Sequence, residues 1–154
     1  MMVNKKPSEL KSHIGYRLRA VSNAVSHSFA RKLITSEVTV AEWVILREMY
    51  DKSEIISSSM IAELTGLTRG AVSKLVDRLV RKNLIIRTES TADRRFLRIE
   101  LSSKAKELVP ALAAIADEND EAFFSSLSKK EQKILMDILI KLSEIHQLNT
   151  SPIQ

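Results

Sequence analysis

The spacing of hydrophobic residues predicts a chain made mainly of helices. From Ser8 to Ile34, apolar side chains recur every three or four residues, which is the period of one helical face. This stripe consists of Leu10, Ile14, Leu18, Val21, Val25, Phe29 and Leu33. Because it runs the whole length of the predicted helix, we expect it to be buried against an extended partner surface.

Three shorter helical segments follow, each with a cap in the sequence. Thr39 and Glu42 form a capping box at the start of AEWVILREMY. A serine precedes the next segment, SSSMIAELTG, and Gly66 closes it. Thr68 is placed to cap the third, TRGAVSKLVDRLVRKN, and Asn83 stands where a left-handed residue ends a helix. The apolar face of this third segment consists of Val72, Leu75, Val76 and Leu79.

The hydrophobic period then changes from helical spacing to alternation. LIIRTES and RFLRIEL alternate apolar and polar residues around a short polar tip, which predicts a β-hairpin. Helical spacing resumes at Ser102 or Ser103 and continues to about Phe124. A last helix begins at a second capping box, Ser128 and Glu131. The fold class is therefore mainly α with a small β-hairpin.

Positive charge is concentrated in the middle of the chain. Residues 68–98 contain nine lysines and arginines and three acids, a balance of +6, whereas the whole chain carries only +5. The rest of the chain therefore sums to −1. Such clustering is typical of a protein that binds a polyanion, although a solvated helical face could produce it by chance.

Two helices joined by the tight TGL turn and followed by a hairpin indicate a winged helix-turn-helix. With its apolar face turned inward, the second helix presents its other residues to the major groove of double-stranded DNA. Arg69 is long enough to read guanine, and Arg78, further along the helix, is suited to a phosphate. The predicted contacts on this helix are Thr68, Arg69, Gly70, Ser73, Lys74 and Arg78.

The order of these elements resembles the MarR family of bacterial transcription regulators over about residues 10–148. The stretches that carry the resemblance are IGYRLRAVSNAVSHSF, VTVAEWVILREMYD, IAELTGLTRGAVSKLVDRLVRKNLIIR and DRRFLRIELSSKAKEL. The resemblance implies a homodimer whose N- and C-terminal helices form a dimerisation domain. The expected organisation is a single unit over 1–154, with a DNA-binding lobe at 36–101, dimerisation helices at 8–35 and 102–148, and a disordered tail at 149–154. Within the lobe, the helix-turn-helix spans about 57–83 and the wing about 84–101.

The resemblance also assigns roles in the wing and in an effector cleft. Asp93 and Arg95 would brace the tip of the wing, and Arg94 would enter the minor groove, although the two arginines could exchange roles. Many members of the family bind small anionic aromatic molecules between the dimer helices and the winged helix. Residues that could border such a cleft are Tyr16, Arg17, Trp43 and Tyr50. The alternative is that Trp43 and Tyr50 are ordinary core residues of their helix.

Other chemistry has little support in the sequence. The chain has no cysteine, which excludes disulfides and Cys-ligated zinc. His13 and His27 would lie about 21 Å apart along one helix and cannot share a metal ion within the chain. No phosphate loop or nucleophile motif is present, so we expect no enzyme activity, cofactor or metal. Without a membrane span or signal segment, the expected location is the cytoplasm.

The sequence as a whole predicts a sequence-specific regulator that binds a pseudo-palindromic operator as a homodimer. The resemblance implies that its action would usually be repression and that a small aromatic or anionic effector could release it; the alternative is a repressor without a ligand. The rival hypotheses are an architectural or RNA-associated winged helix without sequence specificity, and a protein-interaction module that does not use DNA.

Overall fold

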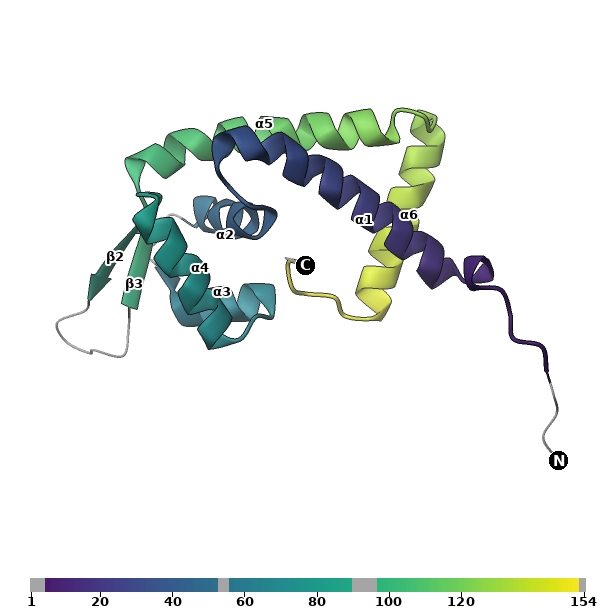
Figure 1. The fold of residues 1–154 in the computed structure, drawn as a ribbon, viewed down its shortest axis with the longest axis horizontal. Coiled ribbons are helices and arrows are strands. Elements are labelled where there is room, and N and C mark those ends of the chain that lie inside the picture. The colour runs from purple at the N-terminus through teal and green to yellow at the C-terminus, as the bar shows by residue number, and fades with distance from the viewer. Residues whose placement is uncertain (1–4, 53–55, 90–96, 153–154) are drawn as a thin grey trace.

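The structure is a computed structural model that describes residues 5–52, 56–89 and 97–152. The predicted mainly α fold with a hairpin is confirmed (Figure 1). In chain order, the elements are η1 (Leu10–Ser12), α1 (Ile14–Leu33), η2 (Ile34–Ser36), α2 (Val40–Tyr50), β1 (Ile56–Ser57), α3 (Ser58–Thr65), α4 (Arg69–Arg81), β2 (Ile85–Glu89), β3 (Leu97–Leu101), α5 (Ser103–Phe124) and α6 (Lys129–Ile145).

The long helices α1 and α5 lie side by side along the top of the molecule in Figure 1. Helix α2 packs beneath them, and α3 and α4 lie below α2. The β2–β3 hairpin projects at the end of the molecule where α5 begins. This arrangement places α4 and the hairpin on the same side, away from the α1–α5 layer.

The sheet has three antiparallel strands in the order β1-β3-β2. Arg87 of β2 faces Ile99 of β3, and Ile99 also faces Ile56 of β1. The sequence analysis did not predict β1, because two residues are too few to show an alternating pattern. The strand matters for the fold because it joins the start of α3 to the hairpin.

The caps predicted from the sequence are present. Thr39 and Glu42 form a complete capping box at α2, and Ser128 and Glu131 form another at α6. The side chains of Ser57, Thr68 and Ser102 each accept a backbone N–H at the start of their helices. Gly66 and Asn83 have positive φ angles of 73° and 60°, as expected of residues that end helices.

The first helix begins later than the predicted residue Ser8. Residues Leu10–Ser12 form a 3₁₀ turn, and His13 adopts an extended conformation before α1 starts at Ile14. The Ser12 hydroxyl donates to the Glu9 carbonyl at 2.6 Å. Such local bonds between side chain and backbone compete with helix formation and account for the break.

One hydrophobic core is shared by the long helices and the helix-turn-helix. Leu33 of α1, Leu46 of α2, Leu79 of α4, Ile99 of β3 and Leu112 of α5 are all completely buried. The other buried apolar residues are Phe29, Val38, Ile45, Met49, Ile61, Val72, Val76, Leu84, Ile85, Leu101, Ala105 and Val109. These contacts fix the position of α4 relative to α1 and α5.

A buried polar contact also joins α1 to α5. Asn119 is only 4% exposed. Its side chain accepts a hydrogen bond from the Ser28 hydroxyl at 2.8 Å and donates one to the Val25 carbonyl at 3.2 Å. Because buried amides need partners, these bonds specify how the two helices align.

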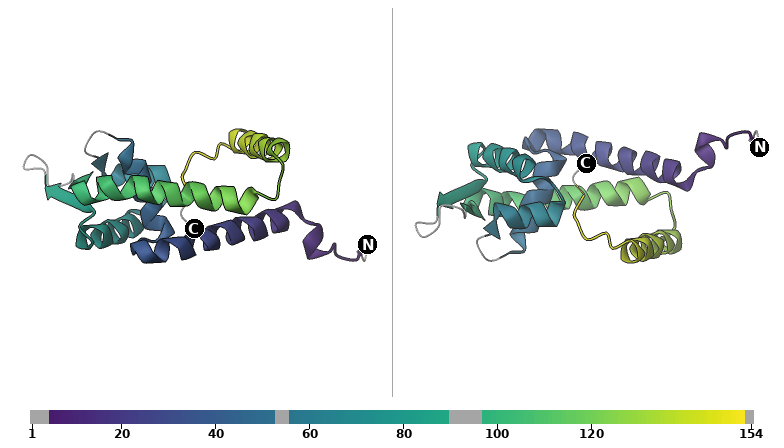
Figure 2. Two further views of the ribbon diagram at one scale, coloured as in Figure 1. Left: turned by 90° about the horizontal axis from the view of Figure 1, so that it is seen from above. Right: turned by 90° about the horizontal axis from the view of Figure 1, so that it is seen from below.

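The apolar stripe of α1 is not buried along its whole length within the chain. Phe29 and Leu33 lie in the core, but Ile14 is 84% exposed and Leu18 and Val21 are nearly half exposed. The reason is that the first half of α1 extends beyond the residues that form the core (Figure 2). The described chain alone therefore leaves this half without the cover that the sequence analysis expected.

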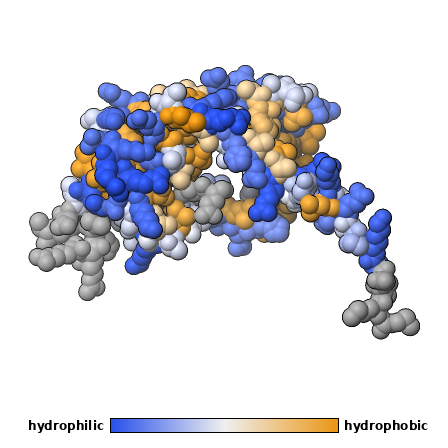
Figure 3. Space-filling model, in the orientation of Figure 1, coloured by the Kyte–Doolittle hydropathy of each residue, from blue (hydrophilic) through white to orange (hydrophobic). Residues whose placement is uncertain are grey.

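Helix α6 stands to one side of the α1–α5 pair (Figure 2). It exposes Ile134, Met136, Ile138, Leu139, Ile140, Leu142 and Ile145. Hydrophobic residues accordingly appear at the surface on this side of the molecule (Figure 3). No described helix is both long and apolar enough to cross a membrane. Contiguous exposed apolar surface of this kind marks an interaction site.

The described part of the tail, residues 149–152, contacts α2 and α3, and the expected disorder of the tail stays a prediction. The Ser151 backbone N–H donates to the Leu64 carbonyl at 2.7 Å, and its hydroxyl contacts the Glu48 carboxylate. Thr150 lies beside Gly66, close enough to contact a Cβ placed there. The Leu64 carbonyl is near the end of α3 and needs a partner outside the helix, which explains why this segment binds there.

Candidate DNA-binding site

The helix-turn-helix is formed by α3 and α4 around a tight turn. Gly66 ends α3 in a left-handed conformation, and Thr68 caps α4 two residues later. Val72, Val76 and Leu79 anchor α4 in the core. Its opposite face is therefore open to solvent, and hydrophilic residues gather over this region in Figure 3. All six residues predicted to contact DNA are exposed, namely Thr68, Arg69, Gly70, Ser73, Lys74 and Arg78.

Thr68 and Gly70 define the first turn of α4. The Thr68 Oγ1 accepts the backbone N–H of Ala71 at 3.2 Å, so this hydroxyl both caps the helix and faces solvent. A Cβ placed on Gly70 would meet no atom of the described chain within 4 Å. Packing within the protein therefore gives no reason for glycine at this position, where alanine would be the better helix former.

The buried carboxylate of Glu42 binds two cations of α4. Glu42 is completely buried, and its Oε1 lies 3.1 Å from Arg78 Nη2 and 3.0 Å from Lys82 Nζ. The Lys82 Nζ is also 3.0 Å from Oε2 and donates to the Glu37 carbonyl at 2.7 Å. The same Oε1 accepts the Thr39 backbone N–H at 3.1 Å. One carboxylate thus caps α2 and binds α4.

The environment of Glu42 determines its protonation. Burial of the carboxyl disfavours the charged form, but Lys82, the backbone and hydroxyl of Thr39, and Arg78 outweigh it. The pKa of Glu42 consequently lies below its ordinary value of 4.5. The group is ionised at neutral pH and carries one negative charge beneath α4.

A second ion pair joins α4 to the hairpin. Arg87 of β2 binds the carboxylate of Asp77, which lies on the middle turn of α4. Both side chains are partly exposed, at 36% and 44%. The pair contributes little to stability at this exposure, but it aligns the start of the hairpin with α4.

The ion pairs divide the basic residues of α4 into two groups. Arg78 in the second half of the helix and Lys82 directly after its last residue are paired with Glu42, whereas Arg81 donates only to the backbone carbonyl of Asp77 among the described residues. Within the described part of the chain, no acidic side chain pairs with Arg69 or Lys74 in the first half. Near the helix-turn-helix turn, the charges of Arg69 and Lys74 are therefore not neutralised by an acidic side chain of the described chain. The sequence analysis missed Glu42, because only its capping role is visible in the local pattern.

Asp93, Arg94 and Arg95, the residues predicted to form the tip of the wing, lie outside the described residues. Their proposed division into brace and minor-groove probe stays a prediction. The strands on either side are described, and they pair in register from Ile85–Leu101 to Glu89–Leu97. The predicted hairpin is therefore present up to its tip.

Tyr16, Arg17, Trp43 and Tyr50, expected to border an effector cleft, have different surroundings. Trp43 is half-buried and packs edge-on against Phe29, with ring centroids 6.1 Å apart, as expected of a residue at the edge of the core. Tyr50 is 43% exposed and lies beside the Arg47 guanidinium, so it is not a core residue. Arg17 donates to the Lys11 carbonyl, and Tyr16 is 36% exposed.

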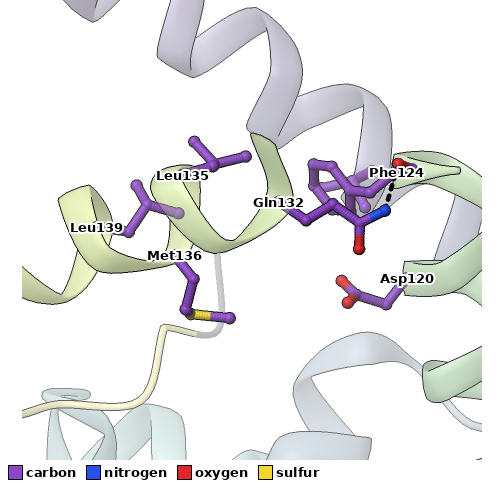
Figure 4. Close-up of a pocket in the computed structure, with 7 residues that line it drawn as sticks. Asp120, Phe124, Gln132, Leu135, Met136 and Leu139 are labelled. Carbon is purple, nitrogen blue, oxygen red and sulfur yellow. Dashed lines mark hydrogen bonds between the residues drawn. The ribbon is translucent and has the colours of Figure 1, made fainter. Parts of the chain in front are cut away.

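A pocket of about 270 Å³ lies instead between α1, α5 and α6 (Figure 4). Its lining residues are Val25, Asp120, Phe124, Gln132, Leu135, Met136 and Leu139. Gln132 Nε2 donates to the Phe124 carbonyl at 3.0 Å, which joins α6 to the end of α5. Among the described residues that line the pocket, the one charged side chain is the acid Asp120, so an anionic ligand is disfavoured here.

Among the residues that the structure describes, no group of three or more His, Asp or Glu side chains could hold a metal ion. His13 bonds locally instead, since its Nδ1 lies 3.1 Å from the Leu10 carbonyl.

The lowered pKa of Glu42 predicts an acid-sensitive contribution to stability. Ionised Glu42 stabilises the fold at pH values above 4.5, its ordinary pKa. This contribution is lost as the pH falls through the lower pKa of the folded state. Glu42→Gln lacks this titration. Urea unfolding from about pH 6 to about pH 3 should therefore show a steeper loss of unfolding free energy for the wild type than for Glu42→Gln.

Glu131→Gln provides a matched control, because Glu131 is also a capping-box glutamate with a lowered pKa but is exposed. This variant should lose less of the wild-type pH dependence than Glu42→Gln, because solvent screens the contacts of the exposed Glu131. Parallel curves for the wild type and Glu42→Gln would show that the buried carboxylate does not contribute in this way.

Comparison with known proteins agrees with this geometry. The MarR family model matches residues 36–95. The MepR–DNA complex of S. aureus is 27% identical, with a TM-score of 0.76 over 86% of this chain and 97% of that chain. A probable transcriptional regulator from Pseudomonas aeruginosa is 25% identical, with a TM-score of 0.76 over 87% and 99% of the two chains.

CouR from Rhodococcus jostii RHA1, bound to p-coumaroyl-CoA, has a TM-score of 0.76 at 20% identity over 90% of this chain and 95% of that chain. At this identity the likeness shows a shared fold. The matching family model, the fold of the MepR–DNA complex and the exposed basic helix agree with one another. Residues 36–95 of the chain thus match the model of the MarR family, and the fold of the chain is that of winged-helix transcription regulators such as MepR.

Proposed function

We propose that this regulator is a homodimeric repressor that binds a pseudo-palindromic operator in double-stranded DNA. The observation that carries the proposal is the exposed face of α4, where Arg69 and Lys74 have no acidic partner among the described residues. In a helix-turn-helix, the first half of the second helix lies against base edges in the major groove. Two such helices in a dimer read half-sites about one helical turn apart.

Each exposed residue of α4 has a role that fits its position. Arg69 reads guanine, while Ser73 and Lys74 reach bases or phosphates. Thr68 and the first amides of α4 donate to a phosphate. Arg78 binds a phosphate through guanidinium nitrogens other than Nη2, which contacts Glu42. In the wing, Arg94 enters the minor groove while Asp93 and Arg95 brace it.

The homodimer is supported by the apolar surface that the chain leaves exposed. This surface lies on the first half of α1 and on α6, far from the DNA-binding face (Figures 1 and 2). A second copy of the chain would cover both regions. In this arrangement, the dimer contacts set the distance between the two copies of α4.

An effector would act by changing that distance. CouR binds p-coumaroyl-CoA on the same fold, which supports a small-molecule ligand. The pocket between α1, α5 and α6 is a candidate site, and because it shares Met136 and Leu139 with the proposed dimer surface, a ligand there would act on the dimer contacts. Its Asp120 favours a neutral or cationic molecule over an anionic one. A coupling of about 1–3 kcal/mol would suffice to change operator occupancy.

The operator itself can be identified by selecting duplexes from a random library with purified protein. A specific regulator should hold the selected duplex about 10³ or more tighter than unselected duplex. Equal affinity for all duplexes would favour the architectural alternative. No binding to any duplex would favour a protein-interaction module.

Arg69→Ala should weaken binding to the selected duplex by about 1–3 kcal/mol and relax the preference at one base pair. The reason is that Arg69 is proposed to read a base edge. Titrations with the selected duplex and its single-base variants measure both effects. Arg47→Ala is the control, because Arg47 pairs with Asp51 on α2. Equal weakening of every duplex by Arg69→Ala would contradict base reading.

Gly70→Ala should separate stability from DNA binding. The added methyl meets nothing in the described chain, and alanine favours the helix by up to about 1 kcal/mol. Thermal stability should therefore rise, while affinity for the selected duplex falls because DNA approaches this backbone closely. Gly15→Ala on α1 also meets nothing within 4 Å and should stabilise without weakening DNA binding. Unchanged affinity in Gly70→Ala would argue against close approach.

Ile138→Asp should disrupt the homodimer, because Ile138 is 50% exposed on α6 and would be buried by a second copy. A carboxylate in an apolar interface carries a large desolvation cost. Sedimentation of the wild type and the variant over a range of concentrations measures the dissociation constant. Lys141→Gln, on the same helix, also lowers the net charge by one and is the control for charge. A monomeric wild type would contradict the proposed assembly.

A further inference from the structure

The charges at the second half of α4 do not all remain available to DNA. Arg78 and Lys82 are bound by the same carboxylate, and Glu42 has no contact with solvent. The three formal charges sum to +1, although the helix surface carries two cations. We call Glu42, Arg78 and Lys82 the buried-carboxylate triad.

We propose that Glu42 sets the charge that the recognition helix presents to DNA and thereby limits sequence-independent binding. This inference rests on the proposed function, in which α4 binds DNA. It adds a role for a residue that does not itself contact DNA. Glu42 is a positioning residue that acts through Arg78 and Lys82.

The burial of Glu42 makes this charge balance permanent. A surface carboxylate could release its cations to a phosphate and take up water in exchange. Glu42 is 0% exposed, so it cannot be hydrated in this fold. Releasing both cations would leave an unpaired buried charge, which is strongly unfavourable. The balance therefore persists when α4 meets DNA.

The position of the triad on α4 determines which kind of DNA binding its net charge affects. Sequence-independent affinity comes from cations that neutralise phosphates. Arg69 and Lys74 lie in the half of α4 that faces the bases, whereas Arg78 and Lys82 lie one to three turns further along. Reducing the net charge there lowers attraction to any duplex and leaves the base-reading half unchanged.

Four proteins test this inference by varying the net charge of the triad. Lys82→Gln has a triad charge of 0, the wild type +1, Glu42→Gln +2, and the Glu42→Gln/Lys82→Gln double variant +1. The measurement is affinity for an unselected pool of duplexes as a function of salt concentration. Each added charge should steepen the log–log slope by about 0.9.

We expect Glu42→Gln to bind unselected duplex more tightly than the wild type at low salt. A fourfold rise in salt should reduce this advantage about threefold, as one extra phosphate contact requires. Glutamine is also found at this position of a capping box, so the side chain of the variant can still accept the Thr39 backbone N–H at the start of α2. A slope equal to that of the wild type in folded Glu42→Gln would overturn the inference.

Asp51→Asn is the matched control for net charge. It also removes one negative charge from α2, but its partner is Arg47 rather than a residue of α4, and both side chains are exposed. We expect a smaller change in slope for this variant. Equal steepening by Asp51→Asn would show that overall charge, and not the triad, controls binding.

In Glu42→Gln, both Arg78 and Lys82 lose their acidic partner, which could destabilise the fold. The double variant removes one of these two cations and therefore serves as a second test if Glu42→Gln misfolds. Circular dichroism monitors folding in every variant. The double variant should return to the wild-type slope even though Glu42 is absent. A folded double variant with a different slope would mean that Glu42 acts only by supporting the fold.

The same data distinguish failure of this inference from failure of the proposed function. If the wild type enriches no duplex from the random library, sequence-specific regulation is wrong, and the slopes on unselected duplex still decide the role of the triad. If the wild type binds no DNA at all, both are wrong. A specific wild type with four equal slopes overturns only the inference.

Discussion

A carboxylate without access to water must keep its partners, and this constraint at Glu42 determines how the recognition helix is held. The group caps α2 through Thr39 and binds α4 through Arg78 and Lys82. The two cations are one helical turn apart, so both can reach a single carboxylate from the same face of α4. Sliding or rotating α4 would separate at least one of them. Burial of Val72, Val76 and Leu79 stabilises the packing of α4 but is not directional. The ion pairs with Glu42 fix the orientation of α4.

Formal charge therefore overstates what the DNA-binding surface offers. The basic window contains nine lysines and arginines, but Arg78, Lys82 and Arg87 are occupied by carboxylates of the same chain. These pairs also serve the architecture, because they join α4 to α2 and to the hairpin. A basic residue on a recognition helix thus has to be assigned by its neighbours as well as by its place in the sequence. Arg69 and Lys74 differ from Arg78 in this respect, although all three are exposed.

Local signals made most of the fold predictable from the sequence. Thr39, Thr68 and Asn83 determine the start or end of an element through bonds within a few residues, and each acts as its residue type predicts. The alternating pattern of the hairpin and the exposed face of α4 were visible for the same reason. Features that depend on distant partners were not visible. Glu42 and Lys82 are forty positions apart, Ser151 binds Leu64 of α3 and Glu48 of α2 far back in the chain, and β1 is too short to show a period.

The shared core determines whether the winged-helix lobe can fold without the long helices. Leu33 of α1 and Leu112 of α5 pack in the same cluster as Leu79 of α4 and Ile99 of β3. A fragment limited to residues 36–101 would lose the first two and expose apolar surface to water. The lobe is consequently not a module that can be transferred to another protein without its long helices. In evolution, such a regulator would acquire new specificity by changing side chains on α4 in place, and exchange of the whole lobe would demand a matching α1 and α5.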